Sequence, residues 1–141
     1  MLKVLVPVDG SKTAERAVKH VIELAKGHES MQVHLVNVQQ EADAWEVRRL
    51  LKPDEIKRLQ LDHGAEALRT ASALLDRAGL GYKTHVLIGD PAEKIVQFAK
   101  RNGIGKIIIG THGRGSMVGL LMGSVASKVL HLATVPVTLV K

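Results

Sequence analysis

Two kinds of apolar pattern alternate along the chain. Short runs of β-branched and aliphatic residues lie at 2–8, 31–38, 82–88, 106–109 and 135–140. Such runs predict strands that are buried on both faces. The last run has Pro136 near its beginning, where an edge strand tolerates the missing N–H. Between the runs, apolar residues recur every three or four positions, which is the spacing of helices that pack on one side.

Capping residues mark the ends of these helices. Residues 89–93 read Gly-Asp-Pro-Ala-Glu, which combines an N-cap aspartate, a proline at the first helical position and an early glutamate, and Gly103 should end this helix. Ser11 is expected to cap the first helix and Gly27 to close it, around an apolar stripe of Ala14, Ala17, Val18, Val21, Ile22 and Ala25. The last helix is expected to carry Val125, Val129, Leu130 and Ala133 at helical spacing.

The longest helix is expected over 54–78, ended by Gly79 and Gly81. His63 falls on its apolar face and is expected to pack there. The polar stretch 39–53 before it has no clean period, which predicts a loop or a short helix through Trp45 to Leu51; long loops often cover binding sites. The expected inner face of the long helix is Ile56, Leu59, His63, Ala67, Leu68, Ala71, Leu74, Leu75 and Ala78.

Strands and helices strictly alternate, which is typical of an α/β fold with a parallel sheet covered by helices on both faces. At 141 residues, the chain is expected to form a single domain over 1–141 with a five-stranded sheet. Open sheets of this kind bind ligands at the carboxyl ends of the strands, where the strand order reverses. That switch point should lie between the first strand and the fourth.

A glycine-rich stretch follows the fourth predicted strand. Gly110-x-x-Gly113 is followed, nine residues later, by Gly123-Ser124. Glycines let backbone N–H groups converge on an anion, and the start of the next helix adds partial positive charge. The donors nearby are Thr111, His112, Arg114, Ser116 and Ser124. Because the spacing matches neither the P-loop nor the dinucleotide fingerprint, the residues alone allow either a phosphate site or a plain flexible turn.

Asp9 ends the first predicted strand, so it should face the glycine-rich stretch across the switch point. We expect its carboxylate to contact a ligand there. The alternative is a structural role as a turn residue or helix cap.

Composition narrows the class of partner. Without cysteine there can be no disulfide, no thiolate-bound zinc and no thiol nucleophile. No signal peptide and no membrane span are expected, which predicts a cytoplasmic protein. A net charge of +6 is compatible with binding to nucleic acid. However, the chain has only three aromatic residues, Trp45, Tyr82 and Phe98, which are too few for a surface that stacks bases. Small phosphates are therefore the expected partners.

Together these motifs resemble the universal stress protein family over the whole chain. The residues that carry the resemblance are Val-Pro-Val-Asp9-Gly-Ser-x-x-Ala14-x-x-Ala17, Gly89-x-Pro91 and Gly110-x-x-Gly113-x9-Gly123-Ser124. The family has members that bind ATP and members that lack the glycine motif and do not. The resemblance implies a Rossmann-like fold of the adenine nucleotide alpha hydrolase type. It also implies binding of ATP, or of ADP or AMP, with or without Mg²⁺.

The resemblance further implies roles for single residues. Pro7 and Val8 would form the floor of the crevice, Asp9 would take the ribose or the adenine edge, and Val38 would offer backbone groups to adenine. Asp9 is also the one candidate ligand for Mg²⁺. The residues expected around ribose and phosphates are Gly110, His112, Gly113, Arg114, Gly123, Ser124 and Val125.

The family pairs through its last strand, which implies a homodimer through 135–140. The loop interior at 117–122 is markedly apolar for a phosphate loop and is a candidate contact with a partner subunit.

The sequence favours a nucleotide-binding regulator of the stress response over an enzyme. It has no P-loop lysine and no paired carboxylate beside the glycine stretch, which leaves room for slow ATP hydrolysis at most. One alternative is an interaction protein that binds no nucleotide. Another is a receiver-like phosphorylatable switch, with Asp9, Asp90, Thr111 and Lys141 near the required positions. Against the switch, the acidic pair after the first strand is missing and Asp90 is typical of a helix cap.

Overall fold

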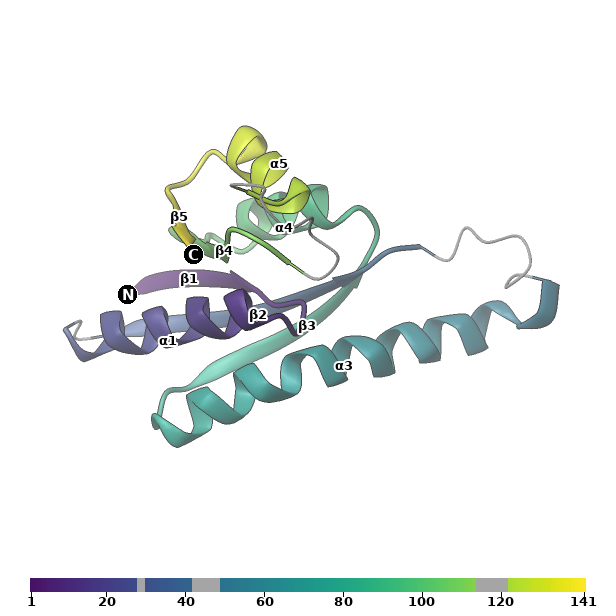
Figure 1. Cartoon of the computed structure of the whole chain (residues 1–141), viewed down its shortest axis with the longest axis horizontal. Helices are drawn as coiled ribbons and strands as arrows, with labels where there is room; N and C mark the ends of the chain where they lie inside the picture. Colours follow the sequence, from purple (N-terminus) through teal and green to yellow (C-terminus); the bar gives the residue numbers. More distant parts are fainter. Residues whose placement is uncertain (28–29, 42–48, 114–121) are drawn as a thin grey trace.

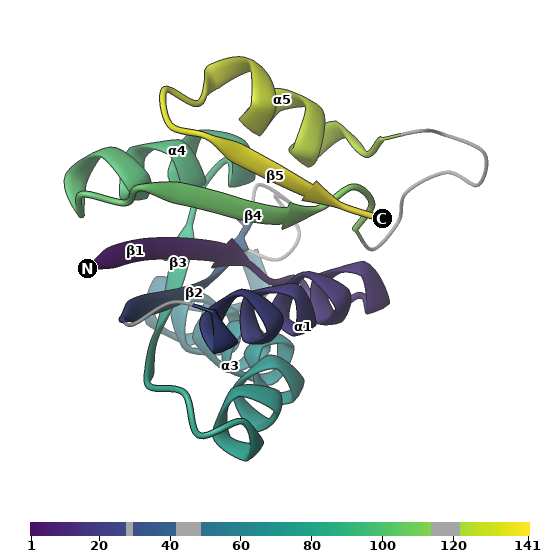
Figure 2. The same cartoon turned by 90° about the vertical axis from the view of Figure 1, so that its left-hand side faces the viewer.

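The five predicted strands form one parallel sheet. A computed structural model describes residues 1–27, 30–41, 49–113 and 122–141. The sheet order is β3-β2-β1-β4-β5, and every neighbouring pair is parallel (Figure 2). The order reverses between β1 and β4, as predicted. The strands are β1 (Leu2–Pro7), β2 (Met31–Gln39), β3 (Tyr82–Ile88), β4 (Lys106–Gly110) and β5 (Val137–Val140).

Helices cover both faces of this sheet, which confirms the predicted fold class (Figure 1). On one face, α1 (Lys12–Lys26) and α3 (Pro53–Arg77) enclose a core with Val4, Val6 and Leu35. On the other, α4 (Pro91–Arg101) and α5 (Ser124–Leu132) enclose a second core with Leu5, Val36 and Ile107. No helix within the described ranges is long and apolar enough to cross a membrane.

The predicted caps hold three helix ends in place. Ser11 accepts a hydrogen bond from the Ala14 N–H, and Asp90 accepts one from the Glu93 N–H at 3.0 Å. At the end of α3, Gly79 takes a positive φ of 71°, which a residue with a side chain rarely adopts. The Leu80 N–H then reaches back to the Leu75 carbonyl, which closes the helix with a Schellman motif.

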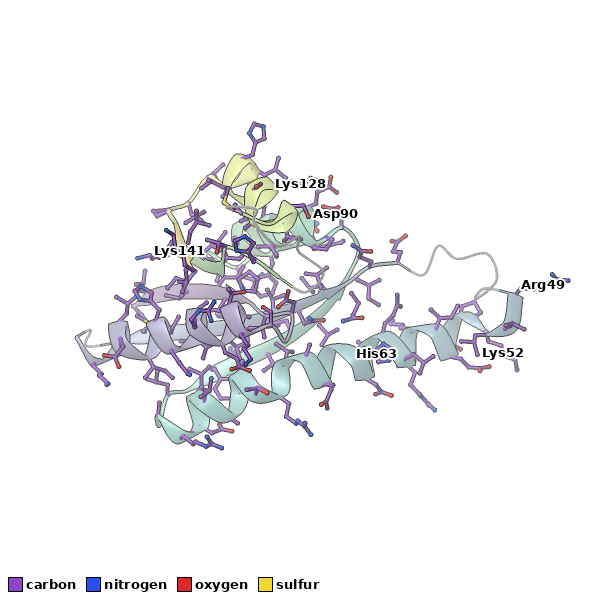
Figure 3. All side chains as sticks on the ribbon, viewed as in Figure 1. Arg49, Lys52, His63, Asp90, Lys128 and Lys141 are labelled. Carbon is purple, nitrogen blue, oxygen red and sulfur yellow. The ribbon has the colours of Figure 1, made fainter. Side chains whose placement is uncertain are left out.

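The inner face of α3 differs from the predicted one. His63 is exposed midway along the helix (Figure 3), and Leu59 is 45% exposed. Gly64 is buried in their place, because its missing side chain lets α3 approach β3 closely. The packing prediction for His63 was therefore wrong. The expected short helix through Trp45 to Leu51 lies largely outside the described residues.

A histidine pair that the apolar pattern did not reveal lies between the sheet and α4. His34 of β2 and His85 of β3 approach to 3.0 Å between Nδ1 and Nε2, and Phe98 of α4 packs on His85 with ring centroids 4.6 Å apart. Burial is the main cause that lowers the pKa of both rings. The pKa of His34 is lowered further by His85 and by the ammonium groups of Lys83 and Lys3. Lys83 also lowers the pKa of His85. The pair therefore resists protonation in the folded protein.

This pair should make the protein less stable in mild acid. The unfolded chain binds protons at the ordinary histidine pKa of about 6.5, whereas the folded pair binds them only at lower pH. The free energy of unfolding should therefore fall as pH decreases through about 6.5. Urea denaturation of the wild type across this range should show the fall, and the His34→Leu/His85→Leu double variant should lose most of it. An equal slope in both proteins would contradict the prediction.

Candidate binding site at the switch point

A cavity opens at the carboxyl ends of β1 and β4, at the switch point of the sheet. Its volume is about 470 Å³. Every residue predicted for the site contributes to the lining except Arg114, which lies outside the described residues. The predicted residues that line it are Pro7, Val8, Asp9, Val38, Gly110, His112, Gly113, Gly123, Ser124 and Val125. The sequence therefore predicted which residues lie together around this cavity.

Asp9 and Gly113 bring the two sides of the cavity together. The Ser11 N–H donates to Asp9 Oδ1 at 2.9 Å, which fixes the carboxylate at the end of β1. A Cβ at Gly113 would overlap Asp9 Oδ2. Glycine at position 113 therefore lets the loop after β4 lie directly against the Asp9 carboxylate.

Both ends of the glycine-rich stretch are anchored. A Cβ on Gly110 would stand 3.0 Å from backbone and side-chain carbons of Thr13, so the strand end needs glycine to pass α1. Thr13 also donates its hydroxyl to the His112 carbonyl. The Thr111 N–H bonds the Val140 carbonyl at 2.8 Å, and the Gly123 N–H bonds the Thr111 carbonyl. These bonds draw the two ends of the loop together at the mouth of the cavity.

The N-terminus of α5 faces this cavity without a side-chain cap. Gly123 is the N-cap residue, and its own N–H is already used by Thr111. The backbone N–H groups of Ser124, Val125 and Ala126 precede the first possible helical hydrogen bond, and all three residues line the cavity. By contrast, side chains cap α1 and α4. The start of α5 can therefore receive an anion, through residues that follow Gly123.

The buried face of α5 also differs from the predicted stripe. Ala126 and Val129 are its buried residues, whereas Val125 is 36% exposed and Leu130 is 45% exposed. Exposure of Val125 follows from its place on the cavity wall. The apolar spacing alone could not separate a residue facing a cavity from one facing the core.

The opposite wall is built by the end of β2. Asn37 is buried, donates from Nδ2 to the Val8 carbonyl at 2.7 Å, and accepts from Gln39 Nε2 at 2.7 Å. Gln60 of α3 donates to the Gln40 carbonyl at 2.9 Å. These bonds fix the backbone around Val38 and the floor at Val8. Lining residues that the sequence analysis did not assign to the site include Asn37, Gln40, Pro91 and Ile95. For Asn37, the sequence signal was a single asparagine within a mostly apolar strand.

An ion pair ties the two helices on this side of the sheet. Lys128 Nζ of α5 lies 3.1 Å from Asp90 Oδ2 and 3.6 Å from Glu93 Oε1 (Figure 3). The Glu93 N–H and Lys128 hold the pKa of the Asp90 carboxyl below its usual range. Asp90 is thus used as a cap and an ion-pair partner, which disfavours the receiver-like alternative.

The described residues do not form a metal cage. They contain no group of three histidine, aspartate or glutamate side chains close enough to hold an ion. Asp9 is the one carboxylate in the described lining of the cavity, so phosphate oxygens and water would have to complete the shell of a Mg²⁺ ion.

Comparison with known proteins agrees with this architecture. The chain matches the Universal stress protein family over residues 1–141. It is 32% identical to universal stress protein MJ0531 of Methanocaldococcus jannaschii, over 99% of this chain and 81% of that protein.

Solved structures share the fold over almost the whole chain. The structure of protein MJ0577 has a TM-score of 0.86 and 31% identity, covering 99% of this chain and 95% of that one. The universal stress protein from Archaeoglobus fulgidus, solved in complex with dAMP, has a TM-score of 0.69 and 24% identity, covering 100% and 98%. The fold, the glycine-rich stretch and the full-length match lead to one conclusion. The chain belongs to the universal stress protein family.

Proposed function

We propose that this protein binds an adenine nucleotide, ATP among them, in the cavity at the switch point and acts as a regulator in the stress response. The observation that carries the proposal is that the uncapped start of α5 and the Asp9 carboxylate open onto the same cavity. The helix start is suited to bind phosphate, and the Asp9 carboxylate is suited to accept hydrogen bonds from hydroxyl or amine groups. A nucleotide has both kinds of group.

The phosphates would lie at α5. Free N–H groups at a helix start bind anions through hydrogen bonds and the helix dipole. Ser124 adds a hydroxyl, and His112 lies on the same wall. We also propose Arg114 as a phosphate contact, on the basis of the sequence alone.

The nucleoside would lie between β1 and β2. Asp9 can accept from ribose hydroxyls, and the backbone at Val38 can pair with an adenine edge, as the family resemblance implies. Around them the wall is apolar, with Val36, Ile95 and Ile109. A planar base is a suitable occupant of such a wall. The Archaeoglobus fulgidus protein, which shares this fold, has been solved in complex with dAMP.

Hydrolysis would be slow at most, because binding a triphosphate does not require machinery to cleave it. Asp9 is already oriented by the Ser11 N–H, and no other carboxylate belongs to the described lining of the cavity. With Mg²⁺ present, we propose that Asp9 is its protein contact and that turnover stays below about 1 s⁻¹.

Asp9 provides the direct test. Asp9→Ala should weaken binding of ATP and adenosine alike by about tenfold or more, the effect of losing a hydrogen bond to a charged group. Tripolyphosphate binding should change little, because it does not need a nucleoside contact. Calorimetry on the folded variant measures all three ligands, with Glu23→Ala on the far part of α1 as control. Unchanged adenosine affinity would contradict the proposal.

We also propose a homodimer through β5. β5 pairs only with β4 in the described structure, so its other edge is open. The carbonyls of Pro136 and Val140 point to β4, and strand alternation therefore directs the backbone groups of Val137 and Leu139 outward. A two-fold copy can pair with them and remove an exposed edge.

Val137→Pro should convert such a dimer to a monomer while leaving the fold intact. Proline removes the outward N–H of Val137 and no hydrogen bond to β4. Sedimentation at micromolar concentration should show the change, and circular dichroism should show unchanged secondary structure. A wild-type monomer, or a variant that still dimerises fully, would contradict pairing through β5.

A further inference from the structure

The opposite edge of the sheet is also open. β3 pairs with β2 and with no other described strand. The Gly89 N–H bonds the Gln39 carbonyl at 2.9 Å, so alternation directs the backbone groups of Thr84, Val86 and Ile88 away from β2. Val86 and Ile88 are only half-buried, whereas Val4, Leu5 and Val6 at the middle of β1 are fully buried. β3 therefore presents a row of amide donors and acceptors along an apolar strand.

A second cavity runs between this edge and α4. Its volume is about 240 Å³. Leu87, Ile88 and Phe98 give it an apolar floor, and the α4 residues at its rim carry amide and cationic groups. The full lining is Leu87, Ile88, Lys94, Gln97, Phe98, Arg101 and Asn102. A groove between an edge strand and a helix is the geometry in which an extended peptide adds to a sheet.

The charged side chains that line this groove are all positive. Lys94 and Arg101 belong to its rim, and neither forms an ion pair within the described residues. Lys83 of β3 is a third cation, close enough to the histidine pair to lower the pKa of both rings. The one carboxylate of these two elements, Glu93, lies by Lys128 at the other end of α4. An acidic partner would meet no local negative charge.

We infer that the groove between β3 and α4 binds an extended acidic segment of a partner protein. The segment pairs as a new strand with the outward amides of Thr84, Val86 and Ile88. Its apolar side chains fill the cavity over Leu87 and Phe98, and its carboxylates meet Lys94 and Arg101. A second copy of this chain is a poor occupant, because a two-fold pairing at β3 would bring these cations together. Single-stranded nucleic acid is also a poor occupant, because the Phe98 ring is packed against His85.

The probe is an acetylated peptide of about eight residues, within the length of ordinary strands, in which valine and glutamate alternate at every second position and threonine fills the positions between. In a paired strand the valines and glutamates then lie on one face, toward the groove. Titrated into the wild-type protein without nucleotide, it should shift the NMR signals of β3 and α4 and lose affinity as salt is added. The glutamine version of the peptide should bind at least about tenfold more weakly. A valine–glutamate peptide methylated on every backbone nitrogen should do the same, since neither of its edges can pair as a strand.

Two matched pairs of variants locate the groove. Arg101→Glu should weaken peptide binding at least about tenfold, whereas Lys100→Glu, on the same last turn but outside the cavity lining, should not. Thr84→Pro, which removes an outward N–H, should weaken it similarly, whereas Thr84→Val should not. ATP affinity should be unchanged in all four, because none of these residues lines the first cavity.

Several results would overturn the inference. They are the absence of peptide binding, equal effects within either matched pair, and tight binding of the methylated peptide. A saturable effect of free glutamate at the same residues would indicate a small-anion site. Tighter binding of a single-stranded oligonucleotide with the same dependence on Arg101 would assign the groove to nucleic acid.

Discussion

Ser124→Asp should bind ATP about a hundredfold more weakly than the wild type and should at the same time be slightly more stable. The two effects have opposite signs because both come from the same helix N-terminus. A carboxylate at the first position of α5 complements the helix dipole, which is worth about 0.3–1 kcal/mol. The same carboxylate occupies the place proposed for phosphate.

The size of the binding effect follows from electrostatics. A carboxylate about 4 Å from one phosphate charge is repelled by about 4 kcal/mol at an effective dielectric constant of about 20. Ser124 is exposed, so solvent screening should reduce this to about 2–3 kcal/mol, which corresponds to a loss of roughly 30- to 150-fold. Loss of the serine hydroxyl adds to the effect.

Ser127→Asp is the matched control. Ser127 lies on the same helix, is exposed, and is not part of the cavity lining. It should leave ATP affinity close to the wild-type value. Calorimetry and thermal denaturation of both variants separate binding from folding. A Ser124→Asp variant that binds ATP normally would show that α5 does not receive the phosphates, and the glycine-rich stretch would then be a plain turn.

The sequence was sufficient for the fold because the signals for its elements are local. Strand β3 and helix α4 have the predicted bounds, since Gly89, Asp90 and Pro91 define the turn between them and each acts within a few residues. Alternation of strands and helices predicted the parallel sheet, and the predicted switch point lies between β1 and β4. The face of α3 did not follow, because α3 is positioned by contacts with β3 that are distant in sequence.

The candidate site was predictable to the extent that backbone chemistry defines it. Asp9, Gly110, Gly113 and Gly123 are recognisable because the chain must turn at a strand end. Asn37 and Gln40 contribute through hydrogen bonds to other elements, and no pattern around them specifies those partners. The same limit applies to His34 and His85, which meet only once β2 and β3 are paired.

The close approach of α3 to the sheet depends on Gly64, so Gly64→Val should destabilise the protein by about 2–4 kcal/mol. A Cβ at this position would overlap Val86 Cγ1, stand 2.8 Å from Val86 Cγ2 and lie 3.2 Å from Asn37 Oδ1. Valine has few χ1 alternatives, so Val86 cannot easily turn away. Overpacking typically costs about 1–3 kcal/mol, and the added methyl groups of valine increase the overlap.

Helix propensity alone predicts that Gly64→Val stabilises the protein, so the sign of the measured change in stability distinguishes the two effects. Replacing glycine within a helix should stabilise it by up to about 1 kcal/mol, so a stabilised variant would mean that α3 does not pack as closely as described. Gly81→Val is the control, because nothing lies within 4 Å of its Cβ. Adding Val86→Ala to Gly64→Val should restore part of the loss in urea denaturation, since contacting residues are not additive. If the folded Gly64→Val protein also binds ATP more weakly, the displaced group is Asn37, which holds the Val8 carbonyl at the floor of the site.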